Sequence, residues 1–227
     1  MPLIYQHNIN RNTKLGVWRI DEPESFFLKR VPLKSDVTHP HKRLQHLAGR
    51  YLLPALYDDF PLEEIVVADT RKPFLENEKY HFSISHSSDF AAAIVSSTKR
   101  VGVDIEMVGP RVMNIRHKFL HAGEYISART GQGDVTAPAY VGQDRQHEDA
   151  YSDEELLTLL WSAKESIYKW YGSGKINFQD HIRLTGPVLG NKNDFLEMPF
   201  VFLKSDPVSL NVGGKFFEQT VLAWVTS

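Results

Sequence analysis

The chain has 227 residues, a formal charge of −2 and no cysteine, with 42% hydrophobic and 24% charged residues. This composition is typical of a globular protein; it excludes disulfides, thiol nucleophiles and thiolate metal sites, and it argues against a dedicated nucleic-acid binder, which usually carries a basic surplus. No apolar stretch approaches the roughly 18 residues of a membrane helix, and the first residues do not resemble a secretory signal, so we expect a cytoplasmic protein that does not act at a membrane.

The first half of the chain is predicted to contain one helix among short strands. Thr38 can cap a helix whose first turn contains Pro40, because the following apolar residues recur with helical spacing. Pro54 should end or kink this helix. Strands are expected over residues 15–20, 64–68, 82–85, 90–96 and 100–108, with a turn at 70–73.

The second half contains the clearest predicted helix, over residues 152–172. Ser152 and Glu155 form a capping box, and Gly172 is a natural stop. The preceding segment 127–152 is rich in Gly, Gln, Asp and Ala, which indicates a long surface loop or a partly ordered insertion. Because short connections rule out helical crossovers, the fold class is predicted to be mixed α/β with predominantly antiparallel sheet. Further strands are expected over residues 182–184, 200–203, 208–212 and 221–225.

Residues 101–106 read Val-Gly-Val-Asp-Ile-Glu. Since side chains alternate along a strand, the three β-branched residues should face the core, while Asp104 and Glu106 share the other face with Gly102. The glycine should leave open space beside the two carboxylates. Such carboxylates repel each other unless a cation lies between them, and hard oxygen ligands suit Mg²⁺. The alternative is a solvated polar face.

A polar stripe follows one side of the otherwise apolar helix 152–172. Thr158, Ser162, Glu165 and Lys169 recur at intervals of three or four residues. The stripe either faces a site or faces water, where a Glu–Lys pair contributes about 0.3–0.5 kcal/mol.

Residues 82–87, Phe-Ser-Ile-Ser-His-Ser, place hydroxyl and imidazole groups at the end of a strand. These groups could bind an anion, or Ser85 and Ser87 could cap their own turn while His86 is merely exposed. A Ser/His hydrolase is disfavoured, because the chain lacks a Gly-x-Ser-x-Gly elbow and adjacent strand residues point to opposite faces.

Taken together, these motifs resemble those of the 4′-phosphopantetheinyl transferase superfamily. Its hallmarks are a Val-Gly-(Ile/Val)-Asp strand and a Trp-(Ser/Cys/Thr)-x-Lys-Glu-(Ala/Ser)-x-x-Lys helix, and the chain matches both. The resemblance covers roughly residues 40–175, and the chain length is similar to that of the long, single-chain Sfp type. The motifs, in chain order, are Lys72-Pro73-Phe74, residues 82–87, residues 101–106 and residues 161–169.

The resemblance implies an enzyme that moves the phosphopantetheine arm of coenzyme A to a serine of an apo acyl or peptidyl carrier protein and releases adenosine 3′,5′-bisphosphate. It implies that Mg²⁺, or Mn²⁺, is held against the pyrophosphate by Asp104, Glu106 and Glu165. Glu165, or a water that it orients, would accept the serine proton, and Lys169 would support the leaving phosphate. The implied coenzyme A contacts are Arg43, Arg50, Lys72, Ser85, His86 and Lys169.

The resemblance also implies two similar α/β halves related by a pseudo-two-fold axis, each a long helix on a small antiparallel sheet. The halves would span residues 1–105 and 106–227, with coenzyme A in the cleft between them. Because two such halves mimic a dimer, a monomer is expected. In this family the connection before Ser152 borders the carrier-protein site, so its unusual composition bears on docking.

Two other functions remain open at this point. A different Mg²⁺-dependent phosphodiester enzyme, such as a nuclease, could use the same three acids, although the near-neutral charge counts against it. A non-catalytic relative could bind coenzyme A or a carrier without turnover, but it would be expected to lose one of the acids or Lys169.

Overall fold

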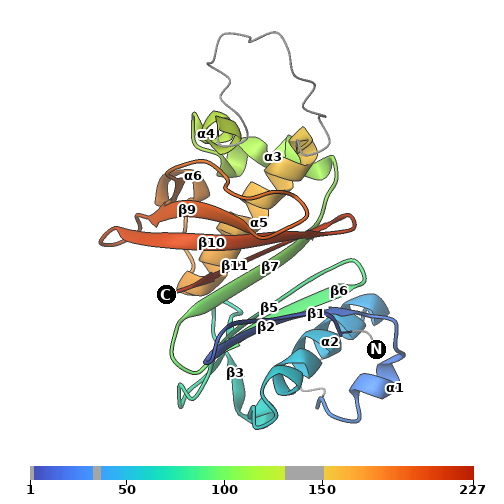
Figure 1. Ribbon diagram of the computed structural model, residues 1–227. Helices are drawn as coiled ribbons and strands as arrows, with labels where there is room; N and C mark the ends of the chain where they lie inside the picture. Colours follow the sequence, from blue (N-terminus) through green and yellow to red (C-terminus); the bar gives the residue numbers. More distant parts are fainter. Residues whose placement is uncertain (1–2, 33–36, 131–150) are drawn as a thin grey trace.

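The computed structural model describes residues 3–32, 37–130 and 151–227. In this part the chain folds into layers of helix, sheet, sheet and helix (Figure 1). Every pairing between the described strands is antiparallel. The predicted mixed α/β class with predominantly antiparallel sheet is therefore confirmed.

The N-terminal layers are a helix and a four-stranded sheet in the order β1-β2-β6-β5. Helix α2 (Pro40–Leu56) buries its apolar side against this sheet. The contact is close, because a Cβ atom at Gly49 would lie 2.5 Å from Ile84 of β5. The strands are β1 (Leu3–Asn10), β2 (Thr13–Arg19), β5 (His81–Ser87) and β6 (Phe90–Ser96); beside them lie α1 (Glu24–Phe27), η1 (Leu62–Glu64) and the hairpin of β3 (Ile65–Val67) and β4 (Pro73–Leu75).

The C-terminal layers are a five-stranded sheet in the order β7-β11-β10-β9-β8 and the long helix α5 (Asp153–Tyr171) that packs on it. Shorter helices border α5 (Figure 1). The strands are β7 (Val101–Met107), β8 (Ile182–Leu184), β9 (Leu196–Phe202), β10 (Val208–Phe217) and β11 (Thr220–Thr226), and the shorter helices are α3 (Arg111–Phe119), α4 (Glu124–Thr130) and α6 (Phe178–His181).

The two sheets pack face to face through a core of their own. Val103 and Ile105 of β7 meet Leu15 and Ile94 of the N-terminal sheet there, and none of these side chains reaches solvent. The predicted alternation along residues 101–106 is therefore correct, and it turns Asp104 toward α5.

Serine side chains join the two sheets where β5 and β7, both edge strands, run together. The backbone N–H groups of Val103, Ile105 and Met107 donate to the hydroxyls at positions 83, 85 and 87, over 3.2, 3.3 and 3.3 Å. Because buried backbone donors need partners, these hydroxyls satisfy an edge that would otherwise be unpaired. The alternation of serine along β5 thus fixes the register between the sheets.

The helix predicted over residues 152–172 is confirmed in detail. The Ser152–Glu155 capping box is formed, and Gly172 ends the helix in the left-handed region at φ 76°.

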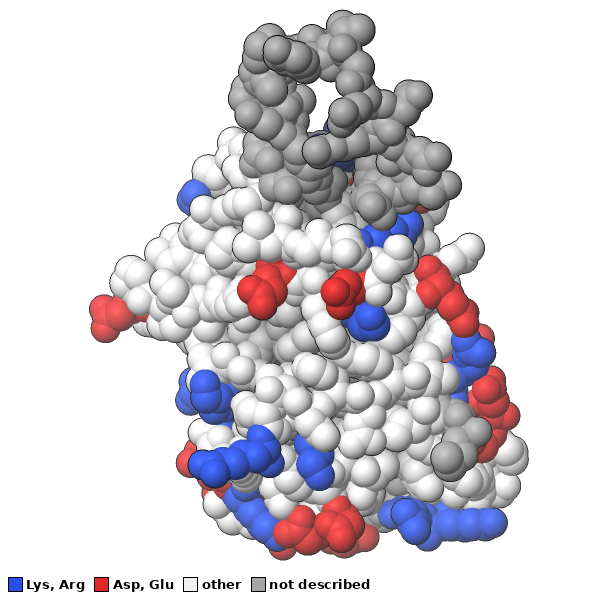
Figure 2. All heavy atoms as spheres, in the orientation of Figure 1, with Lys and Arg blue, Asp and Glu red and all other residues white. Residues whose placement is uncertain are grey.

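None of the described helices is both long and apolar enough to cross a membrane. In Figure 2, acidic and basic side chains are interspersed around the lower rim of the face shown, and a few acidic side chains with a basic one lie across its middle.

Several local predictions are wrong. The cap of α2 is His39, whose Nδ1 accepts from the Lys42 N–H, and not Thr38. Pro54 does not end the helix, which continues to Leu56 because apolar packing on the sheet outweighs the hydrogen bond that a proline loses. A kink at Pro54 stays a prediction.

Part of the segment predicted as a loop, residues 127–130, belongs to α4, and residues 131–150 lie outside the described part. Strand β1 was not predicted, because its side chains alternate only between half-buried and exposed and so give no apolar signal. The boundary at residue 105, the pseudo-two-fold and the monomeric state stay predictions.

The open space expected beside Gly102 does not exist, since a Cβ atom there would lie 2.0 Å from the Ser166 carbonyl oxygen of α5. We therefore expect Gly102→Ala to push α5 off the sheet and to lower the free energy of unfolding by about 2–4 kcal/mol, measured by urea denaturation. The matched control is Gly109→Ala, because nothing lies within 4 Å of a Cβ atom at that position. Equal stability of the two variants would contradict the close packing.

Candidate active site

The candidate site is centred on Asp104, which is 3% exposed. Its Oδ1 atom accepts hydrogen bonds from Lys169 Nζ at 2.6 Å and from the Ser85 hydroxyl at 2.8 Å. Lys169 also donates to the Ser85 hydroxyl at 2.8 Å. These contacts bring together β5, β7 and α5, so the structure gathers three of the predicted site residues.

Glu106, two residues further along β7, lies on the same face as Asp104. Trp161 of α5 donates its indole N–H to Oε1 at 3.3 Å, and Ser87 donates its hydroxyl to Oε2 at 3.2 Å. Burial raises the pKa of Glu106, and the charge of Asp104 raises it further. Both hydrogen bonds oppose this rise and hold the carboxylate at the edge of a cavity between β7, α3 and α5.

Glu165 has the strongest shift among the three carboxyls whose convergence was predicted. Burial raises its pKa to about 7, with the charge of Asp104 adding to the rise and that of Lys169 opposing it. The charge of Glu106 also contributes. The charge of Asp104 therefore disfavours the ionisation of both glutamates, which places the three carboxyl groups near one another.

The three carboxyl groups nevertheless do not form a preformed metal-binding site. No group of three His, Asp or Glu side chains among the described residues is arranged to hold an ion. Lys169 donates a hydrogen bond to the Oδ1 atom of Asp104. The Oδ2 atom is buried and has no hydrogen-bond partner in the described part of the chain. An unpartnered oxygen and mutual repulsion among three carboxyls are what a hard divalent cation relieves, so these residues fit such an ion.

Basic side chains of α2 and β5 lie around His46. Arg50 Nη1 donates to His46 Nδ1 at 3.1 Å. Burial, followed by the charges of Arg50 and His86, lowers the pKa of His46 to about 4. Desolvation lowers the pKa of His86, and the charges of Lys169 and Lys42 add to this effect. The predicted residues Arg50 and His86 therefore both lie near His46, and the guanidinium is the lasting positive charge of the three groups.

Arg43 is not part of this cluster of basic groups. Its Nη2 and Nε atoms lie 2.7 Å and 2.8 Å from Glu24 Oε1, where they fasten α1 to α2. Its charge is therefore already compensated by a carboxylate, which weakens the prediction that it binds a phosphate.

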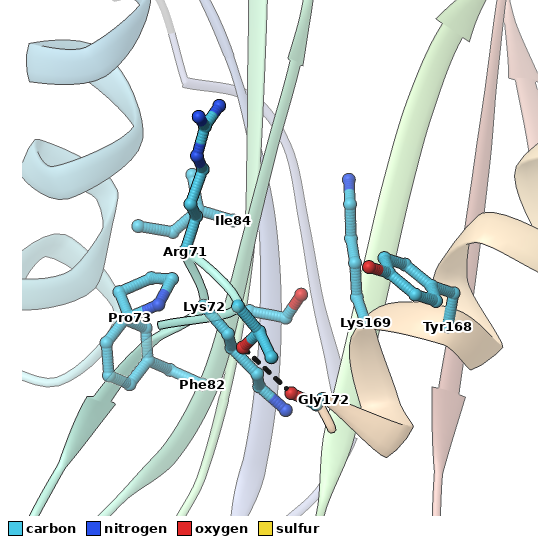
Figure 3. Close-up of a pocket in the computed structure, with 10 residues that line it drawn as sticks. Arg71, Lys72, Pro73, Phe82, Ile84, Tyr168, Lys169 and Gly172 are labelled. Atoms are coloured by element: carbon cyan, nitrogen blue, oxygen red, sulfur yellow. Dashed lines mark hydrogen bonds between the residues drawn. The ribbon is translucent and has the colours of Figure 1, made fainter. Parts of the chain in front are cut away.

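A cavity of about 190 Å³ opens between the turn at residues 70–73, strand β5 and the end of α5. Figure 3 shows Lys169 at its wall, and it shows the ammonium group of Lys72 beside Gly172. That ammonium donates to the Trp170 carbonyl at 3.3 Å, and Thr70 donates its hydroxyl to the Gly172 carbonyl at 3.1 Å. The turn thus caps the C-terminus of α5 across the interface.

Sequence reasoning did not predict the contacts that three residues make at the site. Trp161 and Ser87 orient Glu106, and His46 accompanies Arg50. The spacing of four between His46 and Arg50 on a helix is a usable signal. The contacts of the other two depend on strand and helix positions that only the fold supplies.

Lys164 belongs to the same helix motif but lies outside the site. Its fully buried ammonium pairs with Glu124 at 2.7 Å and donates to the Phe119 and Ile182 carbonyls at 2.7 and 2.8 Å. This pairing fixes the rotation of α5, so that the next residue, Glu165, faces β7.

Comparison with known proteins agrees with this geometry. The family model of the 4′-phosphopantetheinyl transferase superfamily matches residues 100–192, which include β7 and α5. The chain is 39% identical over 134 residues to the 4′-phosphopantetheinyl transferase AcpT of Salmonella typhimurium, covering 58% of this chain and 60% of the relative. It is 29% identical over 141 residues to AcpT of Escherichia coli K12, covering 62% and 64%.

A third relative is the 4′-phosphopantetheinyl transferase psf-1 of Bacillus pumilus, 29% identical over 128 residues, which are 55% of this chain and 47% of that protein. The chain thus spans about half to just under two thirds of the length of these three relatives. The resemblance to the superfamily is confirmed, whereas the Sfp type stays a prediction.

The raised pKa of Glu165 predicts a pH-dependent stability in the presence of a chelator. The folded protein holds this proton with a pKa of about 7 against an ordinary 4.5, so the stabilising contribution is complete below about 4.5 and is lost as the pH rises through 7. Glu165→Gln imitates the protonated form. We therefore expect the variant to gain stability relative to the wild type between pH 4.5 and 7.5, measured by urea denaturation.

The control for removing one charge from α5 is Glu154→Gln in its first turn. Stability curves of the wild type and Glu165→Gln that stay parallel over this pH range would show that Glu165 ionises freely in the folded state.

Proposed function

We propose that this chain, which is similar to the 4′-phosphopantetheinyl transferase superfamily over residues 100–192, transfers 4′-phosphopantetheine from coenzyme A to a serine hydroxyl of an apo acyl or peptidyl carrier protein. The serine oxygen forms a bond to the phosphorus that carries pantetheine, the bond from that phosphorus to the bridging oxygen breaks, and adenosine 3′,5′-bisphosphate leaves. The observation that carries the proposal is the joining of Lys169 and Ser85 to the buried carboxylate of Asp104.

Lys169 supplies positive charge where the leaving phosphate gains negative charge. Its ammonium is already oriented by two hydrogen bonds, to Asp104 and to Ser85, so little reorganisation is needed during the reaction. It also lines the cavity that we assign to coenzyme A, together with Lys72.

Glu165 is the group that we assign to proton transfer. A carboxylate with a pKa of about 7 matches the pH at which a general base works best, because it is a stronger base than an ordinary glutamate and is still substantially ionised. It accepts the serine proton directly or through a water that it orients.

A divalent cation, Mg²⁺ or Mn²⁺, would be held by Asp104, Glu106 and Glu165. When bound, it neutralises the charge of the pyrophosphate. The unpartnered Asp104 Oδ2 atom and the raised pKa values of the two glutamates support this assignment.

The remaining contacts of coenzyme A are assigned to basic groups. Arg50 and His86 both lie near His46, and a guanidinium suits a phosphate. Lys72 lines the cavity, although its ammonium also caps α5. Arg43 is the weakest candidate because Glu24 already neutralises it. Residues 131–150, which we expected near the carrier, lie outside the described part of the chain.

The direct test incubates the protein with fluorescent coenzyme A, Mg²⁺ and a panel of apo carrier proteins. We expect labelled carrier, with rates lowered about 10²–10⁴-fold in Glu165→Gln and about 10²–10³-fold in Lys169→Met. Glu154→Gln, at the far end of the same helix, should keep its rate.

Absence of labelled product from the folded wild type with every carrier would refute the transferase. DNA cleavage that is insensitive to coenzyme A would favour the other phosphodiester enzyme, and coenzyme A binding without turnover would favour the non-catalytic relative.

Metal binding has a test that does not depend on activity. Mg²⁺ at about 100 times its Kd should stabilise the folded chain by about 2.7 kcal/mol, seen as a rise of several degrees in the unfolding midpoint. Glu106→Gln should abolish most of this shift. Asp153→Asn should preserve it, because Asp153 lies at the exposed start of α5 and pairs with Arg129. A shift of the same size in Glu106→Gln would contradict the assignment.

A further inference from the structure

A second cavity lies on the other side of the Lys72 turn from the coenzyme A cavity. Its volume is about 330 Å³, which falls within the range of small-molecule sites, and it is bounded by the β4–β5 connection, the start of β7 and the end of α5. The two cavities share Lys72 and Gly172 as walls. None of the residues assigned above to the metal or to proton transfer lines the second cavity.

The walls of this cavity combine aromatic surface with cationic groups. Tyr80 and Trp170 contribute rings, while Lys72, Arg100 and His81 contribute nitrogen groups. Glu78, an exposed residue of the turn before β5, is the one carboxylate on its lining. Flat apolar surface beside convergent cations is the pattern of a site for a ring that carries an anionic group.

The ammonium of Lys72 and the guanidinium of Arg100 form no ion pair with a carboxylate in the described part of the chain. Burial, and then the charge of Arg100, lowers the pKa of Lys72 to about 8, so the two groups are close enough to repel each other. An anion between them would remove this repulsion and raise the pKa of Lys72.

We propose that this second cavity binds a phosphate monoester attached to an aromatic or heteroaromatic ring, as a site separate from the coenzyme A cavity. Arg100 and Lys72 hold the phosphate, since a guanidinium presents paired donors to phosphate oxygens. The ring of Phe74, which is 37% exposed on this lining, contacts the ring of the ligand, and the edges of the buried Tyr80 and Trp170 form the floor behind it. Because Lys72 also caps α5, whose last turns carry Lys169, occupation of this cavity would be linked to the coenzyme A cavity.

The experiment is isothermal titration calorimetry with phenyl phosphate, performed with and without saturating coenzyme A. We expect phenyl phosphate to bind in both conditions, and Arg100→Gln to weaken its affinity at least tenfold. Lys99→Gln is the matched control, because Lys99 is exposed beside Arg100 but does not line the cavity. Glu78→Gln should tighten binding, since it removes the one repelling carboxylate.

Inorganic phosphate should bind more weakly than phenyl phosphate by at least tenfold, because it lacks the ring. The proposal is overturned if Arg100→Gln and Lys99→Gln bind phenyl phosphate equally well. It is also overturned if coenzyme A abolishes the binding, because the probe then occupies the coenzyme A cavity. These binding measurements do not require transferase activity. A failure of this proposal can therefore be distinguished from a failure of the proposed function.

Discussion

A carboxylate that is 3% exposed cannot keep its charge without a partner, and Asp104 finds its partner in Lys169, 65 residues further along the chain. This ion pair determines the position of α5 on β7. The Ser85 hydroxyl, which bonds to both groups, adds the edge of the other sheet. Three elements that are distant in sequence therefore meet at one point because a buried charge has to be compensated.

The negative charge of the carboxyls at this point is only partly compensated, and the uncompensated charge gives the site its chemistry. One ammonium group faces three carboxyls, one carboxylate oxygen has no partner in the described part of the chain, and the pKa of Glu165 rises to about 7. Near this point burial, and then the charges of Arg50 and His86, lower the pKa of His46 to about 4. Carboxyls in excess of their ammonium partner, together with the Arg50 guanidinium, suit a ligand that brings both a divalent cation and phosphates.

The turn at residues 70–73 connects the two parts of the molecule. Thr70 and Lys72 donate to the last carbonyls of α5, and the Lys72 side chain lies so close to Gly172 that a Cβ atom there would be 2.6 Å from it. Gly172 therefore has two reasons to lack a side chain: it ends the helix in the left-handed region, and a Cβ atom there would collide with the Lys72 side chain. This contact separates the two cavities and links them.

Local patterns in the sequence determined the helix with its capping box, the alternation of β7 and most of the remaining strands, because these features depend on neighbouring residues alone. The motifs also identified Asp104, Glu165 and Lys169. Only the tertiary structure decided that Lys169 would pair with Asp104, that α5 would fill the space beside Gly102, that Glu24 would neutralise Arg43, and that Lys72 would cap a helix. Each of these outcomes depends on which distant groups share a buried, poorly solvated space, and spacing along the chain does not carry that information.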